Sequence, residues 1–182
     1  AFSKDDKVFM ELLASWFGLM LLRSRQTAAL QTQALTDALT GLPNRRAAEL
    51  RFVEEIARAR RDHCGFAVAV ADLDRFKLIN DNFGHDVGDE VLRQSSRVMR
   101  EALREGDWIA RWGGEEFLVL CPSTALVDAV RLAELLRSRI GQLDFGLGAA
   151  VTASFGVACH QPGQSLDDLI RSADAELYQA KK

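Results

Sequence analysis

The chain has 182 residues, of which 48% are hydrophobic and 27% charged, which is typical of a soluble globular protein with one full core and an extra element. Its formal net charge of -3 argues against a surface that coats nucleic acid, since such a surface is basic. The cysteines Cys64, Cys121 and Cys159 fit no metal or disulfide pattern. With no secretory leader in view, we expect a cytoplasmic protein.

Residues 1–36 predict one long amphipathic helix. From Asp5 to Ala34 no proline interrupts the chain, and apolar residues recur at a spacing of three or four. The apolar run 12–22 is too short to cross a bilayer, which needs about 20 residues, so we expect no membrane span. An exposed apolar face along such a helix favours a coiled-coil-like homodimer. The alternative is that this face packs on the chain's own domain.

Residues 37–182 predict an α+β domain. A joint rich in helix breakers, 37–46, precedes a helix at about 45–61 that Asn44 can cap, and Ser165 can cap the last helix. The expected order is helix, strand, helix, helix, hairpin, helix, strand, helix. Split β-α-β units with a hairpin between them predict a ferredoxin-like sheet with helices on one face and at its ends.

The first expected strand, 66–71, is an unbroken apolar run, which predicts burial on both faces. It ends in Asp72-Leu73-Asp74, and a helix is expected to begin beside these residues. Carboxylates at a strand end next to a helix N-terminus suit a metal and a phosphate. Asp74 can instead serve the fold, as a cap or turn partner.

A second acidic pair follows the expected hairpin, in the stretch Arg111-Trp112-Gly113-Gly114-Glu115-Glu116-Phe117. The Gly-Gly pair predicts a tight primed turn with positive φ at both glycines. Glycines let a ligand approach the backbone, and the two carboxylates are hard oxygen ligands for Mg²⁺. Taken alone, the stretch also fits a surface hairpin with solvated charges. Together with Asp72, it can hold two metals for in-line attack on phosphorus.

Three segments, 37–46, 72–89 and 111–117, closely resemble the GGDEF family of diguanylate cyclases in its G-G-E-E-F form, and the resemblance covers 37–182. It implies a nucleotidyl-cyclase palm-type fold and a homodimeric enzyme that condenses two GTP into cyclic di-GMP and two pyrophosphates. The segment before Leu22 is similar to the last helix of a GAF sensory domain. We therefore expect a signalling helix at 1–36 and a cyclase domain at 37–182.

The same resemblance implies a metal site. Asp72, the carbonyl of Leu73 and Glu115 would bind two Mg²⁺ or Mn²⁺ ions that bridge the phosphates of one GTP. Glu115 would also help to deprotonate the 3′-hydroxyl, and Glu116 would support the metals.

The resemblance further implies a substrate site. Lys77 and Lys181 would bind phosphates, and Asn80 and Asp89 would bind guanine. A carboxylate can accept from guanine N1–H and its 2-amino group, a pair that adenine lacks, so Asp89 favours GTP over ATP. The rest of the substrate site would be lined by Phe76, His85, Gly113 and Gly114. Phe76 is also explained as core, His85 as a structural imidazole and Lys77 as a solvated lysine.

An R-x-x-D segment, Arg104 to Asp107, lies at the family's distance before the hairpin and resembles its inhibitory product site. Arginine suits the O6/N7 edge of guanine and phosphate. A second arginine would come from the following helix, with Arg131 and Arg137 as candidates. Two other functions remain open: a non-catalytic receptor for cyclic di-GMP or GTP, and a dimerisation module with a silent enzyme fold.

Overall fold

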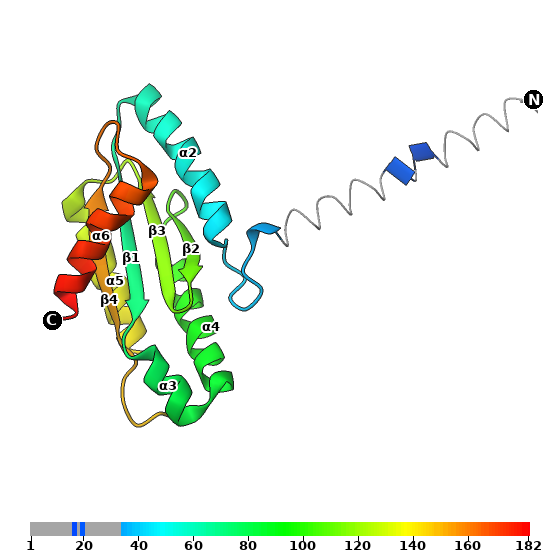
Figure 1. The fold of residues 1–182 in the computed structure, drawn as a ribbon, viewed down its shortest axis with the longest axis vertical. Helices are drawn as coiled ribbons and strands as arrows, with labels where there is room; N and C mark the ends of the chain where they lie inside the picture. The colour runs from blue at the N-terminus through cyan, green and yellow to red at the C-terminus, as the bar shows by residue number, and fades with distance from the viewer. Residues whose placement is uncertain (1–15, 18, 21–33) are drawn as a thin grey trace, which may run out of the picture. The chain divides into compact units, whose positions relative to one another are not determined.

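The computed structural model describes residues 16, 17, 19, 20 and 34–182. The chain divides into two compact units, Ala1–Leu35 and Thr36–Lys182, and the second contains the sheet and its helices (Figure 1). Its elements in chain order are α2 (Arg45–Asp62), β1 (Phe66–Leu73), α3 (Phe76–Phe83), α4 (His85–Ala102), β2 (Trp108–Gly113), β3 (Glu116–Pro122), α5 (Leu126–Gly141), β4 (Ala153–Cys159) and α6 (Leu166–Ala180).

The four strands form one sheet in the order β2-β3-β1-β4, with every neighbouring pair antiparallel. The central strand β1 therefore lies between β3 and the edge strand β4. The expected α+β class with one sheet is confirmed, and the end of β1 lies beside the start of β3 and of β4.

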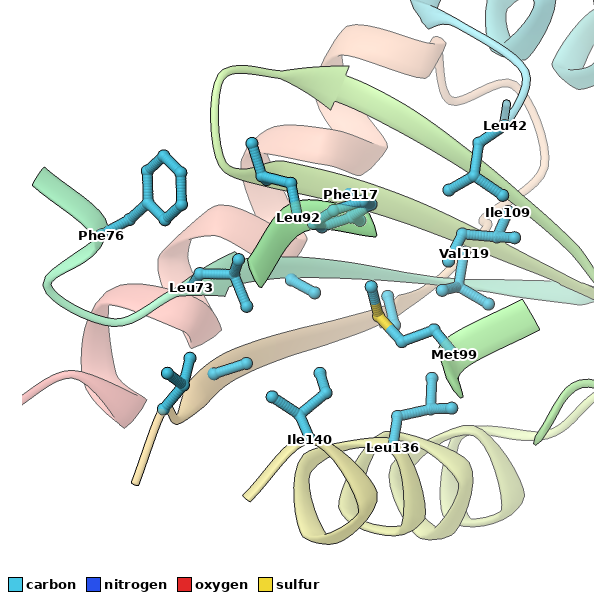
Figure 2. Packing of buried hydrophobic residues seen from close by; sticks show 14 of the residues in the cluster. Leu42, Leu73, Phe76, Leu92, Met99, Ile109, Phe117, Val119, Leu136 and Ile140 are labelled. Carbon is cyan, nitrogen blue, oxygen red and sulfur yellow. The ribbon is translucent and has the colours of Figure 1, made fainter. Parts of the chain in front are cut away.

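Helices cover both faces of the sheet. The odd-numbered residues of β1, from Ala67 to Leu73, belong to a core that α4 and α5 complete (Figure 2). The even-numbered residues, from Phe66 to Val70, belong to a second core with α2 and α6. The expectation of helices on one face and at the ends is therefore wrong. A strand without alternation needs cover on both sides, and α2 and α6 supply the second layer.

Both expected helix caps are present. The Asn44 side chain accepts a hydrogen bond from the Ala47 amide at 3.1 Å, and the Ser165 hydroxyl accepts one from the Asp168 amide at 3.2 Å. Each satisfies one of the free amides of a helix's first turn. The starts of α2 and α6 are thus fixed by local chemistry.

The hairpin turn differs from the prediction. Gly113 is the last residue of β2 and pairs with Glu116 of β3, so the two loop residues are Gly114 and Glu115. Only Gly114 of these has a positive φ, at 23°. The prediction centred the turn one residue too early, because an irregular register between Arg111 and Gly113 carries the first glycine into the strand.

Six described residues of the N-terminal stretch are helical: Trp16, Phe17, Leu19, Met20, Ala34 and Leu35. The first four are each more than half exposed. Most of the helix expected over 5–34, with its coiled-coil character and its likeness to a GAF helix, lies outside the described residues. No helix in the described part of the chain has the length and apolarity to cross a membrane.

Candidate active site

Two carboxylates face each other at the end of the central strand. Asp72 of β1 pairs directly with Glu116 of β3. Side chains alternate between the faces of a strand, so Asp72 continues the row of Val68 and Val70, and Glu116 continues that of Leu118. Both acids therefore lie on the face that α6 covers. Like charges directly opposite each other in a sheet repel, so a nearby cation would stabilise this arrangement.

Helix α6 supplies that cation. The ammonium of Lys181 lies 2.6 Å from Oδ1 of Asp72. Asp174, Leu177 and Lys181 are spaced three and four apart, which places them on one face of α6 and its C-terminal end. Leu177 is buried in the core against the sheet and brings both charged neighbours to the acidic pair. Asp174 is a residue that the sequence analysis missed.

The Glu116 carboxyl has a pKa above its ordinary value. Burial is the largest cause, followed by the negative charges of Asp72, Asp174 and Glu115, while Lys181 acts in the opposite direction. Negative charge is thus crowded here beyond what Lys181 neutralises. A divalent cation would relieve this crowding.

The neighbouring residues Leu73, Asp74 and Glu115 tie the strands together at this point. The Leu73 amide donates to the Glu115 carbonyl at 3.3 Å, which holds the turn against the end of β1. Asp74 accepts from the hydroxyl of Thr152 at 2.6 Å and from that of Ser154 at 2.7 Å. Both oxygens of Asp74 are therefore engaged, one by β4 and one by the residue just before it, as its alternative role in the fold predicts.

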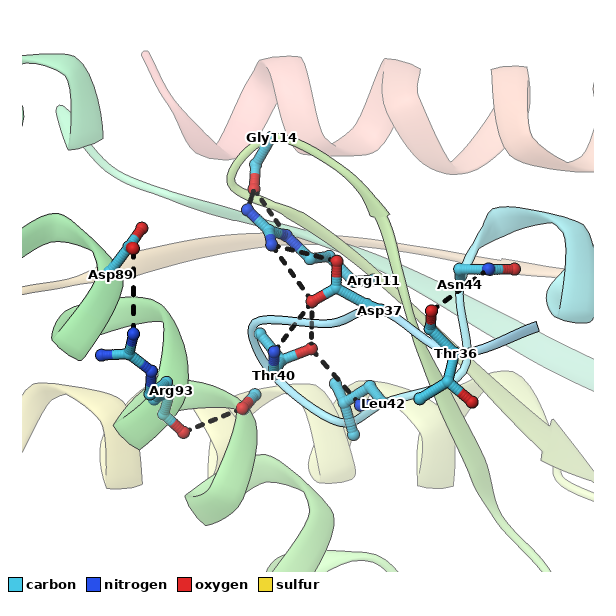
Figure 3. Close-up of polar contacts among 10 residues, drawn as sticks. Thr36, Asp37, Thr40, Leu42, Asn44, Asp89, Arg93, Arg111 and Gly114 are labelled. Carbon is cyan, nitrogen blue, oxygen red and sulfur yellow. Dashed lines mark hydrogen bonds and ion pairs between the residues drawn. The ribbon is translucent and has the colours of Figure 1, made fainter. Parts of the chain in front are cut away.

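Arg111 joins the hairpin turn to the joint before α2 (Figure 3). Its guanidinium donates twice to the Gly114 carbonyl, at 3.0 and 2.8 Å, and also contacts both oxygens of Asp37, at 3.1 and 3.2 Å. Thr40 donates to Asp37 through its amide and its hydroxyl. Burial raises the pKa of Asp37, but these contacts with Thr40 and Arg111 outweigh it and lower the pKa overall. These residues lie within the segments 37–46 and 111–117, but the sequence did not predict that the two segments meet.

The residues expected to bind guanine come from α3 and α4, which pack on each other. A Cβ built on Gly88 of α4 would lie 1.9 Å from Oδ1 of Asn80 and 3.2 Å from Phe76. Gly88 therefore lets the Asn80 side chain rest directly on α4, at the residue that precedes Asp89 in the sequence. Asp89 is half-buried, and among the described side chains it forms a long ion pair, 3.8 Å, with Arg93. A glycine inside a predicted helix was the available signal for this contact.

Of the other expected substrate residues, Phe76 is buried in the core, while Lys77 and His85 are exposed. Lys77 is the second residue of α3 and His85 the first of α4. A cavity of about 550 Å³ lies between α3 and the segment before β4, and none of these three residues lines it. Asp74, Arg75 and Lys181 contribute polar groups to its lining.

The two charged residues of the R-x-x-D segment, Arg104 and Asp107, form an ion pair with each other. Arg104 donates to Asp107 at 3.0 Å and also reaches the Pro122 carbonyl at 3.0 Å and the Thr124 hydroxyl at 2.6 Å. Arg131 instead pairs with Asp128 on its own helix, at 3.1 Å. Arg137 pairs with Glu134 in the same manner.

The acidic cluster suits a hard divalent cation by its chemistry. Asp72, Glu115 and Glu116 offer carboxylate oxygens, and the negative charges around the partly buried Glu116 favour a cation nearby. Among the described side chains, no three of the acidic, histidine or cysteine type stand together as a formed metal-binding group. Binding would therefore require side-chain rotations at the end of β1.

Comparison with known proteins agrees with this geometry. The diguanylate cyclase, GGDEF domain family matches residues 34–182. The chain is 44% identical over 153 residues to the diguanylate cyclase DgcP of Pseudomonas aeruginosa, covering 82% of this chain and 23% of that protein. It is 41% identical over 154 residues to the response regulator PleD of Caulobacter vibrioides, covering 81% and 34%. The chain thus spans well under half the length of these curated relatives.

Solved structures show the same fold. The coiled coil and GGDEF domain of DgcB from Caulobacter crescentus, in complex with c-di-GMP, has a TM-score of 0.86 and 30% identity, with 96% of this chain and 94% of that chain covered. The active GGEEF domain of a Vibrio cholerae diguanylate cyclase has a TM-score of 0.72 and 35% identity, covering 77% and 91%. From Ala34 to Lys182, this chain belongs to the GGDEF-domain family of diguanylate cyclases.

Proposed function

We propose that the chain condenses two GTP into cyclic di-GMP and two pyrophosphates. The observation that carries the proposal is the pairing of Asp72 with Glu116 beside the hairpin turn, where an acidic cluster adjoins a cavity lined by Lys181. Relatives named diguanylate cyclases share the domain over most of this chain.

In the proposed reaction, Glu115 accepts the proton of one GTP 3′-hydroxyl. The oxygen then attacks the α-phosphorus of the other GTP, a bond to phosphorus forms, and the bond to the β-phosphate oxygen breaks as pyrophosphate leaves. Asp72, the Leu73 carbonyl and Glu115, supported by Glu116, would hold two Mg²⁺ or Mn²⁺ ions. Such ions neutralise the charge that develops on the phosphates.

The α3–α4 side of the site would select and position the nucleotide. Asp89 accepts from N1–H and the 2-amino group of guanine, while Asn80 contacts the same base and His85 lies in the wall. Lys77 and Lys181 bind phosphate oxygens as mobile point charges. The close contact at Gly88 supports this assignment, because it holds Asn80 against α4 at the residue that precedes Asp89 in the sequence.

Product inhibition would use Arg104 and Asp107. Asp107 has a side chain only 4% exposed, while that of Arg104 is 60% exposed. Arg104 would therefore have to turn from its own partners to grip a guanine nucleotide, with Arg131 as the second arginine. A homologue bound to c-di-GMP supports the ligand class but not these residues.

Two copies of the chain would have to meet, since one GTP is bound per copy and two phosphodiester bonds close the ring. We propose that the segment 1–36, as the end of a GAF-like sensory domain, brings the copies together. The exposed apolar residues Trp16, Phe17, Leu19 and Met20 support a partner for this segment. The compact unit that begins at Thr36 supports the domain boundary.

Incubation with GTP and Mg²⁺, followed by mass spectrometry, tests the proposal. We expect cyclic di-GMP and pyrophosphate from the natural sequence, and a loss of turnover of at least about 10²-fold in Glu115→Gln with an unchanged circular dichroism spectrum. Absence of product at every protein concentration, including those where a dimer forms, would reject the cyclase. Binding of cyclic di-GMP without turnover would favour the receptor alternative.

A further inference from the structure

Lys181 has one partner in the structure and a different partner in the proposed reaction, and it cannot bind both at once. Its ammonium forms an ion pair with Asp72 at 2.6 Å, and Asp72 is the strand-end carboxylate of the acidic cluster. In the proposed function, Lys181 instead binds the terminal phosphates of GTP, and Asp72 binds metal. One ammonium cannot hold a carboxylate oxygen closely and leave that oxygen to a divalent cation.

The position of Lys181 permits an exchange between these partners. It is the residue that follows α6, so its backbone is anchored by the buried Leu177 one turn earlier. Its side chain is 37% exposed, whereas that of Asp72 is 16% exposed. Lys181 also lines the 550 Å³ cavity, together with Arg75. A flexible lysine stem at this point can turn from the carboxylate to the cavity without moving the helix.

We propose that Lys181 is an exchangeable counter-ion: a divalent cation that binds Asp72 displaces the ammonium, which then grips the phosphates of the incoming nucleotide. This inference rests on the proposed function of the same site. Free metal must compete with Lys181 for Asp72, whereas a metal–nucleotide complex gives the displaced lysine a new partner. Metal and nucleotide therefore bind with positive cooperativity.

The rival explanation is a fixed structural ion pair. In that case Lys181 would stabilise the end of β1, and its removal would lower thermal stability without raising the affinity for metal. The two explanations therefore predict different affinities for a divalent cation when Lys181 is replaced and no nucleotide is present.

Lys182 provides a matched control. Its ammonium lies 4.5 Å from the ring centre of Tyr178 and has no ion pair with the described carboxylates. Lys181→Met and Lys182→Met remove the same charge from adjacent positions, so their long-range effects on a bound cation are alike. Any difference between the variants reports the direct contact with Asp72.

The test is titration of Mn²⁺, without nucleotide, into the natural chain and each variant, with free Mn²⁺ followed by electron paramagnetic resonance. We expect Lys181→Met to bind Mn²⁺ about fivefold more tightly, and Lys182→Met to change the affinity by less than about twofold. With Mn²⁺ saturating, Lys181→Met should bind a non-hydrolysable GTP analogue about tenfold more weakly, which is the opposite direction.

Equal Mn²⁺ affinities of the two variants, or no measurable Mn²⁺ binding to any of the three proteins, would overturn the exchange. Retained affinity of Lys181→Met for the GTP analogue would overturn it as well. The proposed function fails separately: opposite shifts in the two titrations without any cyclic di-GMP would leave the exchange intact and reject the cyclase.

Discussion

At the level of single residues, the end of β1 carries more negative charge than its surroundings neutralise. Burial and three neighbouring carboxylates raise the pKa of Glu116, and Lys181 is the cation that opposes them. A site selected for stability alone would replace one of these acids. The arrangement makes physical sense where a bound cation completes it.

This crowding predicts that Glu116→Gln stabilises the chain at neutral pH. The folded pKa of Glu116 lies above its ordinary 4.5, so the folded chain holds this proton to a higher pH than the unfolded chain does. The contribution of this group to stability is therefore largest below pH 4.5 and falls as pH rises through the folded pKa. We expect the variant to have a Tm about 1–3 °C higher at pH 7.5.

Thermal melts of both proteins from pH 4 to pH 8 without divalent ions measure this difference, which should shrink towards the acidic end. Added Mg²⁺ should then raise the Tm of the natural chain more than that of the variant, because the cation relieves the repulsion. A lower Tm of Glu116→Gln at pH 7.5 would mean that the ionised carboxylate stabilises the fold.

The sequence predicted the acidic residues of the site but not their partners. Asp72, Glu115 and Glu116 stand at recognisable motif positions. Lys181 was assigned to phosphate and Asp174 was not considered, because their contacts depend on how α6 packs across the sheet. The link from Arg111 to Asp37 spans 74 positions, and no local pattern specifies it.

At the level of elements, two glycines let helices approach closely, but against different neighbours. At Gly88 of α4, an added Cβ would meet the end of the Asn80 side chain. At Gly156 of β4, it would lie 2.0 Å from the Ala173 carbonyl oxygen and 2.4 Å from the Leu177 nitrogen, both of the α6 backbone. A side chain can rotate away, whereas a helix backbone has to move as a body.

Alanine substitutions should therefore separate the two contacts. Gly88→Ala should keep the free energy of unfolding within about 1 kcal/mol, since alanine favours a helix, while it displaces Asn80 and weakens binding of a GTP analogue. Gly156→Ala should lower the free energy of unfolding by about 2–4 kcal/mol, because α6 must shift off the sheet. Urea denaturation and calorimetric titration measure the two effects. Comparable loss of stability in both variants would contradict this distinction.

Elements were easier to predict than their assembly. Helix and strand periodicity located α2 and β1 closely, and caps at Asn44 and Ser165 marked the starts of α2 and α6. The uniform apolar pattern of β1 showed that both faces are covered, yet it contains no information on which helix covers which face. The turn was misplaced by one residue because the irregular register in β2 depends on pairing with β3.

At the level of the whole molecule, the described part of the chain offers one acidic cluster and one Asn80–Asp89 side. The proposed product has two phosphodiester bonds related by symmetry, so two copies must each contribute one such set. Each bond would then depend on a separate Glu115. A pair of chains with only one Glu115 would then form the first phosphodiester bond but would not close the ring.

Mixed pairs test that dependence. When the natural chain is mixed with a tenfold excess of Glu115→Gln and subunits exchange, most natural chains pair with a variant and each pair retains one Glu115. One bond should form, releasing one pyrophosphate, and the linear dinucleotide should accumulate over cyclic di-GMP by about tenfold or more. Liquid chromatography with mass spectrometry measures the ratio of linear dinucleotide to cyclic di-GMP.

An excess of Glu54→Gln, a change at an exposed residue of α2 paired with Arg51, should leave the ratio unaltered. Cyclic product without linear dinucleotide in the first mixture would show that a single Glu115 serves both bonds, and the active unit would then need only one intact acidic cluster.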